Sequence, residues 1–213
     1  MPDKDLDRGE SEAESPDAEE PAVVEADTMR LAAFSDAVMA VIITIMAFQL
    51  HAPDGPTVAD AQKVVPSLLV YVLSFTYIGI YWNNHHHLLR ATRRISAGVM
   101  WTNLFLLFWL SLIPVLTGWL SNWYQYSRPA AAYGLAAAAA GFAYYLLVRA
   151  IIRANGRDSF VGTAVSSDVK GLASLVLYLA GVGLAFVSPW ISYALYVSVS
   201  VMWFVPDRRF TRP

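Results

Sequence analysis

Two groups of side chains in this sequence carry chemistry that could bind an ion or move a proton. The first is Asp36, the one carboxylate within the apolar stretch 30–50. In lipid, an ionised carboxylate near the centre of a helix costs about 2.5 kcal/mol or more unless it is paired. Asp36 is therefore either an ion or proton site, or part of a buried hydrogen-bond network with Arg30, Ser35 and polar side chains of other helices.

The second group is the polar cluster 82–87, which reads WNNHHH. Consecutive residues of an α-helix point about 100° apart, so His85, His86 and His87 cannot converge on one ion. No histidine or carboxylate follows at the spacing of one helical turn, so we expect no metal site. We expect one histidine to bond inward and the others to meet the membrane interface; a proton relay is the alternative.

Asn103 and Pro114 are further polar and helix-breaking residues within an apolar stretch. A polar group in hydrocarbon needs a hydrogen bond, and Asn103 is predicted to supply one to the Ser35 and Asp36 side of the first stretch. A bond to a backbone carbonyl is the alternative for Asn103. Pro114 predicts a kink or the local loss of a backbone hydrogen bond.

Six apolar stretches can position these residues. Hydrophobic residues make up 56% of the 213-residue chain and gather in long runs, above the roughly 45–50% of soluble domains. A helix needs about 20 apolar residues to cross the hydrocarbon layer of a bilayer. The candidate spans are 30–50, 64–88, 97–121, 130–152, 170–188 and 190–206. The predicted fold class is all-α, a polytopic membrane protein with six transmembrane helices per subunit.

Charge divides the chain into three predicted regions. Residues 1–28 hold eleven acids against Lys4 and Arg8, without an aromatic residue, and are expected to be a disordered acidic cytoplasmic tail. Residues 29–207 form the transmembrane domain, and residues 208–213 a basic cytoplasmic C-terminus. The tail lacks the basic start and apolar core of a secretory signal, so the first span is expected to remain in the mature protein. The chain has no cysteine, which excludes disulfides and thiolate metal sites.

Basic residues in short loops predict the orientation, since such loops stay on the cytoplasmic side. They follow the second, fourth and sixth spans, whereas the opposite loops contain only two basic residues, Lys63 and Arg128. The basic residues on the predicted cytoplasmic side are Arg90, Arg93, Arg94, Arg149, Arg153, Arg157, Lys170, Arg208, Arg209 and Arg212. Both termini are therefore expected in the cytoplasm.

One face of the first span is set apart by its spacing. On a helical wheel Val41, Thr44, Ile45 and Phe48 fall within about 60° of Val41, whereas Ser35 and Asp36 point away from it. This face could line a conduit. Spacing alone favours the simpler reading, in which apolar residues of this kind pack against other helices or face lipid.

Three motifs together resemble a known family. They are Arg30-x-x-x-Phe34-Ser35-Asp36 at the first span, Trp82-x-x-His85 at the end of the second, and Asn103 eleven residues before Pro114. The pattern is similar to that of prokaryotic members of the transmembrane protein 175 family, whose animal relatives are endosomal and lysosomal potassium channels. The resemblance covers the first three spans well and the last three only in number and hydrophobicity.

The resemblance implies a homotetramer with a central pore lined by the first helix of each subunit. Its pore positions fall on Val41, Thr44, Ile45 and Phe48. It implies a narrow ring of bulky aliphatic side chains, and Val41 is smaller and Phe48 bulkier than is usual there. It also implies permeant potassium ions, no cofactor, and an inter-helix polar network formed by Arg30, Phe34, Ser35, Asp36, Trp82, His85 and Asn103.

The leading functional hypothesis is a potassium-preferring cation channel with a hydrophobic constriction, located in the plasma membrane of a prokaryote. Its expected partners are other copies of the chain, membrane lipid and potassium ions, with no nucleic acid. The alternatives are a proton-coupled transporter that uses Asp36 and the cluster His85–His87, and a non-conducting membrane scaffold. An enzyme is not expected, since the sequence offers no paired carboxylates, no nucleophile with a base and no phosphate-binding glycine loop.

Overall fold

The computed structural model describes residues 16–156, 159, 161–162 and 169–204, and for residues 16–25 it describes the backbone alone. The described residues form helices joined by short segments, with no strand among them, which confirms the predicted all-α class. The helices are α1 (Pro16–Ala47), α2 (Val58–Arg90), α3 (Ala97–Ser111), α4 (Ile113–Asn122), α5 (Ser127–Asn155), α7 (Val169–Leu184) and α8 (Pro189–Phe204). Each predicted span coincides with one of them, the third with α3 and α4 together.

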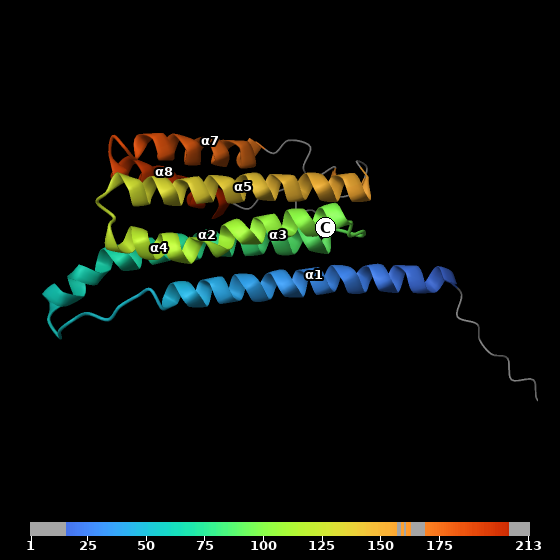
Figure 1. Cartoon of the computed structure of the whole chain (residues 1–213), viewed down its shortest axis with the longest axis horizontal. Helices are drawn as coiled ribbons and strands as arrows, with labels where there is room; N and C mark the ends of the chain where they lie inside the picture. Colours follow the sequence, from blue (N-terminus) through green and yellow to red (C-terminus); the bar gives the residue numbers. More distant parts are fainter. Residues whose placement is uncertain (1–15, 157–158, 160, 163–168, 205–213) are drawn as a thin grey trace, which may run out of the picture.

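The helices lie side by side along the long axis of the molecule (Figure 1). α5 occupies the middle and packs against α3, α4, α7 and α8, whereas α1 lies at one side and packs against α2, α3 and α4. Alanine supplies much of the buried surface of α5, and its small side chain lets neighbouring backbones approach closely. α5 therefore serves as the central packing helix among the described helices.

α1 begins at Pro16, well before the boundary predicted at residue 29. The backbone of residues 16–28 is helical, where the sequence analysis expected disorder. Alanine and glutamate, which are frequent in this segment, are strong helix formers, and extending an existing helix is far easier than nucleating a new one. Residues 1–15 and the predicted C-terminal region 208–213 lie outside the described residues.

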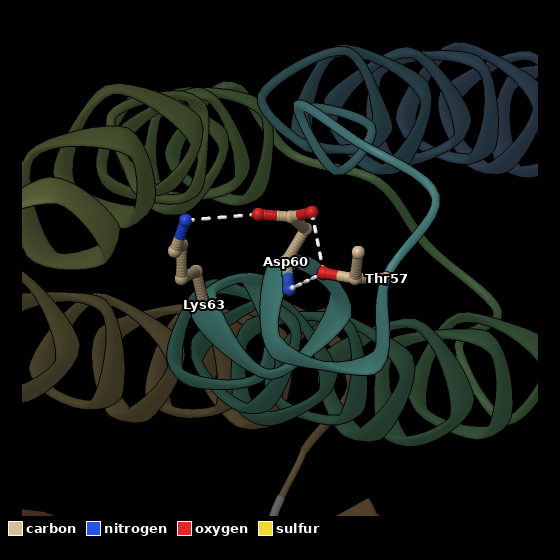
Figure 2. A network of polar contacts seen from close by, with 3 residues as sticks. All are labelled: Thr57, Asp60 and Lys63. Atoms are coloured by element: carbon tan, nitrogen blue, oxygen red, sulfur yellow. Dashed lines mark hydrogen bonds and ion pairs between the residues drawn. The ribbon is translucent and has the colours of Figure 1, made fainter.

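α2 starts at a side-chain cap that is shown in Figure 2. The Thr57 hydroxyl oxygen accepts from the backbone N–H of Asp60 at 3.2 Å and donates to the Asp60 carboxylate at 2.6 Å. Lys63 completes the group with an ion pair to Asp60 at 2.9 Å. These bonds satisfy a backbone donor that has no partner in the first turn of a helix. They define where the chain enters the second span.

The third span is interrupted at Leu112, between α3 and α4. Pro114 follows in the first turn of α4 and lacks the N–H that an uninterrupted helix would direct to the carbonyl of Leu110. The predicted effect of Pro114 on the backbone is therefore confirmed.

Within the described residues, four helical segments are long and apolar enough to cross a membrane. They are Ala26–Ala47, Val58–Arg90, Ala97–Asn122 and Ser127–Asn155. α7 and α8 have 16 residues each within the described ranges. At 1.5 Å per residue they are about 24 Å long, a little less than the hydrocarbon thickness of a bilayer.

Basic residues gather at the end of the bundle where α2 and α5 finish and α3 and α7 begin, here called the basic end (Figure 1). Asn155 links two segments of the backbone at this end by hydrogen bonds. Its Oδ1 accepts from the backbone N–H groups of Arg93 and Arg94 at 2.9 and 2.8 Å, and its Nδ2 donates to the carbonyls of Arg94 and Ile151 at 3.1 and 3.0 Å. One side chain therefore joins the α2–α3 connection to the end of α5.

Asn155→Ala is expected to make tryptic cleavage after Arg93 and Arg94 about tenfold faster, because losing about 1.4 kcal/mol of hydrogen bonding raises the open fraction of the segment tenfold. Fragment mass spectrometry under limiting trypsin measures the rate. Asn122→Ala is the matched control, since among the described residues the Asn122 amide bonds only to Gly118 of its own helix, at 2.9 Å. Equal cleavage rates in the two variants would show that Asn155 does not hold the α2–α3 connection in place.

Candidate functional site

α1 presents two distinct faces. Ser35, Met39, Ile42 and Met46 recur at spacings of four, three and four residues and are buried against the rest of the bundle. This is the spacing of one helical stripe, so α1 is held along a single side.

The other face of α1 is exposed and holds three of the four predicted pore positions, and the fourth, Phe48, continues it just after the helix ends at Ala47. Val41 is 56% exposed, Ile45 44% and Phe48 80%, and Thr44 is also exposed. A long exposed apolar face on a helix that is otherwise well packed marks a surface for lipid or for another protein chain. The four positions lie together and point away from the subunit's own core.

Thr44 adds one polar atom to this apolar face. Its hydroxyl donates to the carbonyl of Ala40 at 2.9 Å, one turn back along the same helix. The hydrogen is therefore engaged by the backbone, and the oxygen keeps a lone pair that faces outward. An oxygen in this state can accept a hydrogen bond or contact a cation.

On the buried side, three predicted network residues from three helices form one hydrogen-bonded chain. The Ser35 hydroxyl donates to the carbonyl of Leu31 at 2.8 Å and accepts from Asn103 Nδ2 at 2.9 Å. Asn103 Oδ1 lies 2.7 Å from His85 Nε2. Ser35, Asn103 and His85 are each fully buried, so the chain links α1, α3 and α2 inside the bundle.

This network of hydrogen bonds also determines which nitrogen of His85 carries the proton. Because Ser35 uses its hydrogen on Leu31, it can only accept from Asn103, which places the amide NH₂ toward Ser35 and the amide oxygen toward His85. His85 Nε2 must then be the donor in the 2.7 Å contact. Within the described residues, His85 Nδ1 is buried without a hydrogen-bond partner.

The structure does not bring the other four predicted network residues into this chain. Arg30 is exposed, and Phe34 and Trp82 are about half exposed. Asp36 is half-buried and makes no hydrogen bond or ion pair within the described part of the chain. Within the described residues of one subunit, these four side chains therefore make no hydrogen bond to Ser35, Asn103 or His85.

Of the three consecutive histidines, His85 points inward to Asn103. The ring of His86 stacks on that of Trp82 with centroids 5.9 Å apart and meets the edge of the His87 ring with centroids 5.7 Å apart. The described residues contain no group of three or more histidine, cysteine, aspartate or glutamate side chains placed to hold a metal ion.

Sequence reasoning missed a second buried chain, which is made of hydroxyl groups. The Thr117 hydroxyl donates to Ser74 Oγ at 2.7 Å, and Ser74 Oγ lies 3.2 Å from the Tyr133 hydroxyl. The same Thr117 oxygen lies 3.8 Å from the sulfur of Met46 on α1. Each of the three apolar spans contains several serine, threonine or tyrosine residues, so no signal in the sequence singles these three out.

Comparison with known proteins gives a consistent result. The family model for the endosomal/lysosomal potassium channel TMEM175 matches residues 30–114, the range that contains every predicted site residue. A potassium channel of Chryseobacterium sp. (strain P1-3) is 41% identical over 180 residues, which cover 84% of this chain and 94% of the relative. A potassium channel of Streptomyces collinus is 32% identical over 180 residues, which cover 78% of this chain and 86% of the relative.

The fold is shared with a solved structure. The crystal structure of a lysosomal potassium-selective channel TMEM175 homolog from Chamaesiphon minutus superposes with a TM-score of 0.76 at 22% identity, over 87% of this chain and 100% of that chain. Together with the apolar helices, these relationships identify an integral membrane protein and confirm the resemblance carried by Arg30, Phe34, Ser35 and Asp36. The chain belongs to the TMEM175 family.

Proposed function

We propose that this protein is a potassium-preferring cation channel, a homotetramer in which four copies of α1 surround a central pore. The observation that carries the proposal is the exposed apolar face formed by Val41, Ile45 and Phe48 at the end of α1, opposite a stripe that is buried from Ser35 to Met46. Relatives described as potassium channels, at up to 41% identity in the comparisons above, support the assignment.

The proposed constriction is apolar. A narrow passage lined by Val41, Ile45 and Phe48 loses its water, and an ion that crosses it loses part of its hydration shell. Four Thr44 oxygens, whose hydrogens are turned back to Ala40, would offer lone pairs to a partly hydrated cation. The barrier to conduction is then set by the width of the apolar rings.

The hydrogen-bond network of Ser35, Asn103 and His85 is proposed to position α1. A hydrogen bond between α1 and α3 holds the buried stripe of α1 inward, and so directs the opposite face toward the pore axis. The basic end is proposed to lie in the cytoplasm of a prokaryote with the plasma membrane around the bundle, because short basic loops are retained there.

No contact in the described part of the chain favours proton-coupled transport through Asp36 and the histidine cluster. His85 is committed to Asn103, His86 stacks on Trp82, and Asp36 has no hydrogen-bond partner there. A transporter would show flux that depends steeply on a pH gradient, so the same flux assay separates the two functions. A scaffold would show no flux.

Reconstitution in liposomes tests the proposal by comparing potassium and sodium flux of the wild-type protein with those of Val41→Ala, Ile45→Ala and Phe48→Ala. Trimming the narrowest ring is expected to raise the leak on the order of tenfold or to lower the preference for potassium, since 1.4 kcal/mol of barrier corresponds to a factor of ten in rate.

Val176→Ala is the matched control, because Val176 of α7 is as exposed as Val41, at 57% against 56%, but lies on another helix. It should leave flux unchanged. Wild-type protein without potassium flux under any gating condition would defeat the channel proposal. Flux that is indifferent to all three α1 substitutions would remove this helix from the pore.

A further inference from the structure

A groove of about 460 Å³, here called the α3–α5 groove, lies between the start of α3 and the last turns of α5. Two arginines line it, Arg149 and Arg153, which are one helical turn apart on α5 and both exposed. Within the described residues neither arginine forms an ion pair or a hydrogen bond, and no acidic side chain lines the groove. Like charges four residues apart on a helix repel each other, so an anion bound between them would relieve this repulsion.

α3 adds backbone donors at the opposite wall of the α3–α5 groove. Ser96 and Gly98 line that wall, and Ser96 Oγ accepts from the backbone N–H of Val99 at 3.3 Å. The N–H groups of Ala97 and Gly98 belong to the same first turn and have no acceptor within the helix. Helix N-termini attract anions, and phosphate groups in particular. Charged side chains of one helix and backbone donors of another therefore border the same space.

Aromatic side chains continue the α3–α5 groove away from the basic end. Tyr145 lines the groove, and the guanidinium carbon of Arg149 lies 5.8 Å from the centre of its ring. The Tyr145 ring stacks on that of Phe142 with centroids 6.5 Å apart. Phe142 on α5 and Phe105 on α3 are exposed, about two turns along their helices from Arg149 and Gly98. Positive charge next to exposed aromatic rings is the arrangement found where a helix leaves the membrane.

We propose that the α3–α5 groove binds an anionic phospholipid, with its phosphate between Arg149, Arg153 and the start of α3 and its acyl chains along Phe105 and Phe142. Charge complementarity supports this occupant, because basic pockets between transmembrane helices near the cytoplasmic surface bind anionic headgroups. A free phosphate carries the same group, but only a lipid would also cover the exposed aromatic rings beside the groove. Such a site would serve a channel, a transporter or a scaffold alike, so its test is independent of conduction.

Thermal unfolding of the purified full chain in detergent, with native mass spectrometry of bound lipid, tests the site. Dioleoyl phosphatidylglycerol is expected to bind more tightly, and to raise the unfolding temperature more, than dioleoyl phosphatidylcholine, whose headgroup has no net charge. Arg149→Gln and Arg153→Gln should each weaken phosphatidylglycerol about fivefold, as expected for one basic residue near a headgroup, and leave phosphatidylcholine unchanged. Arg90→Gln is the matched control. It removes the same charge from the basic end, at the last residue of α2 and outside the groove, and should keep wild-type affinity.

Gly98 offers a pair of variants that differ only in charge. Among neighbouring described residues, a Cβ atom there meets only Ser96 Oγ, at 3.6 Å, so a side chain can be added without a clash. Gly98→Glu places a carboxylate in the first turn of α3, where it favours the helix and competes for the arginines. It should abolish the preference for phosphatidylglycerol over phosphatidylcholine. Gly98→Gln, of the same size but neutral, should keep most of that preference.

The outcomes separate the lipid from a free anion and from a surface without a site. The exposed arginines should be replaceable without loss of folding, and the unfolding temperature without lipid checks this. A wild-type preference for phosphatidylglycerol in the folded double variant Arg149→Gln/Arg153→Gln would overturn the site. The same preference in Gly98→Glu and Gly98→Gln would overturn it too. Inorganic phosphate and glycerol phosphate should not stabilise the protein, and stabilisation by either as large as that by phosphatidylglycerol would overturn the lipid as the ligand.

Discussion

Gly134→Ala is expected to destabilise the protein by about 3 kcal/mol or more and to reduce the yield of folded protein. A Cβ atom at Gly134 of α5 would overlap the hydroxyl of Tyr196 and come within 2.6 Å of its Cζ. The ring cannot withdraw, since Tyr196 is only 1% exposed and its hydroxyl donates to the carbonyl of Ala130 at 3.1 Å. Gly181 of α7 contacts the same ring from another side. Overpacking of this kind has no easy relaxation.

Thermal unfolding in detergent measures this effect, with Gly79→Ala as the matched control. A Cβ atom at Gly79 meets nothing within 4 Å, so that substitution should be neutral or slightly stabilising through helix propensity. Combining Gly134→Ala with Tyr196→Leu should be less harmful than the sum of the single changes, with a coupling of at least about 1 kcal/mol. Gly134→Ala that behaves like Gly79→Ala would show that α8 does not pack as described.

Asn103→Leu has the second largest expected effect, a loss of about 2 kcal/mol. Leucine removes the central member of the chain and leaves His85 Nε2, a buried donor, without an acceptor. Ser35→Ala breaks one of these inter-helix hydrogen bonds where Asn103→Leu breaks both, so it should cost about half as much, about 1 kcal/mol. The expected order of stability is wild type, then Ser35→Ala, then Asn103→Leu.

Thermal unfolding and ion flux in liposomes together check this second prediction. If the chain positions α1, Asn103→Leu should alter flux in the protein that remains folded, whereas Thr102→Val should not. Thr102 is the neighbouring residue on α3, and within the described part of the chain its hydroxyl bonds only to carbonyls of its own helix, at 2.8 and 3.1 Å. An Asn103→Leu protein as stable as Ser35→Ala would show that the amide is not the centre of the network.

Much of the architecture could be predicted because hydrophobic length alone specifies a membrane span. The interruption at Pro114 followed from the missing N–H of proline. Helical periodicity placed Val41 and Ile45 on one face, and the need to satisfy polar groups in lipid predicted the bond between Ser35 and Asn103. In each case one local rule decided the outcome.

The remaining features depend on how whole helices rotate and which neighbours they choose, and periodicity does not contain that information. Thr117, Ser74 and Tyr133 are far apart in the sequence and meet only because α4, α2 and α5 pack in one particular rotation. The fit of Tyr196 against Gly134 and Gly181 has the same origin. α1 starts early, at Pro16, because helix propensity outweighs the effect of charge in this segment, whereas composition alone predicted disorder there.

The two buried hydrogen-bond networks contact α1 at different positions along its length. Ser35 is bonded to Asn103, and about 16 Å further along the helix Met46 contacts the hydroxyl of Thr117. Turning α1 about its own axis would break both contacts at once, whereas moving it together with the whole subunit would preserve them, because Asn103 and Thr117 are bonded in turn to His85 and Ser74 of α2. In the proposed channel, widening of the pore is therefore expected to be easier when each subunit moves as one body than when α1 rotates alone.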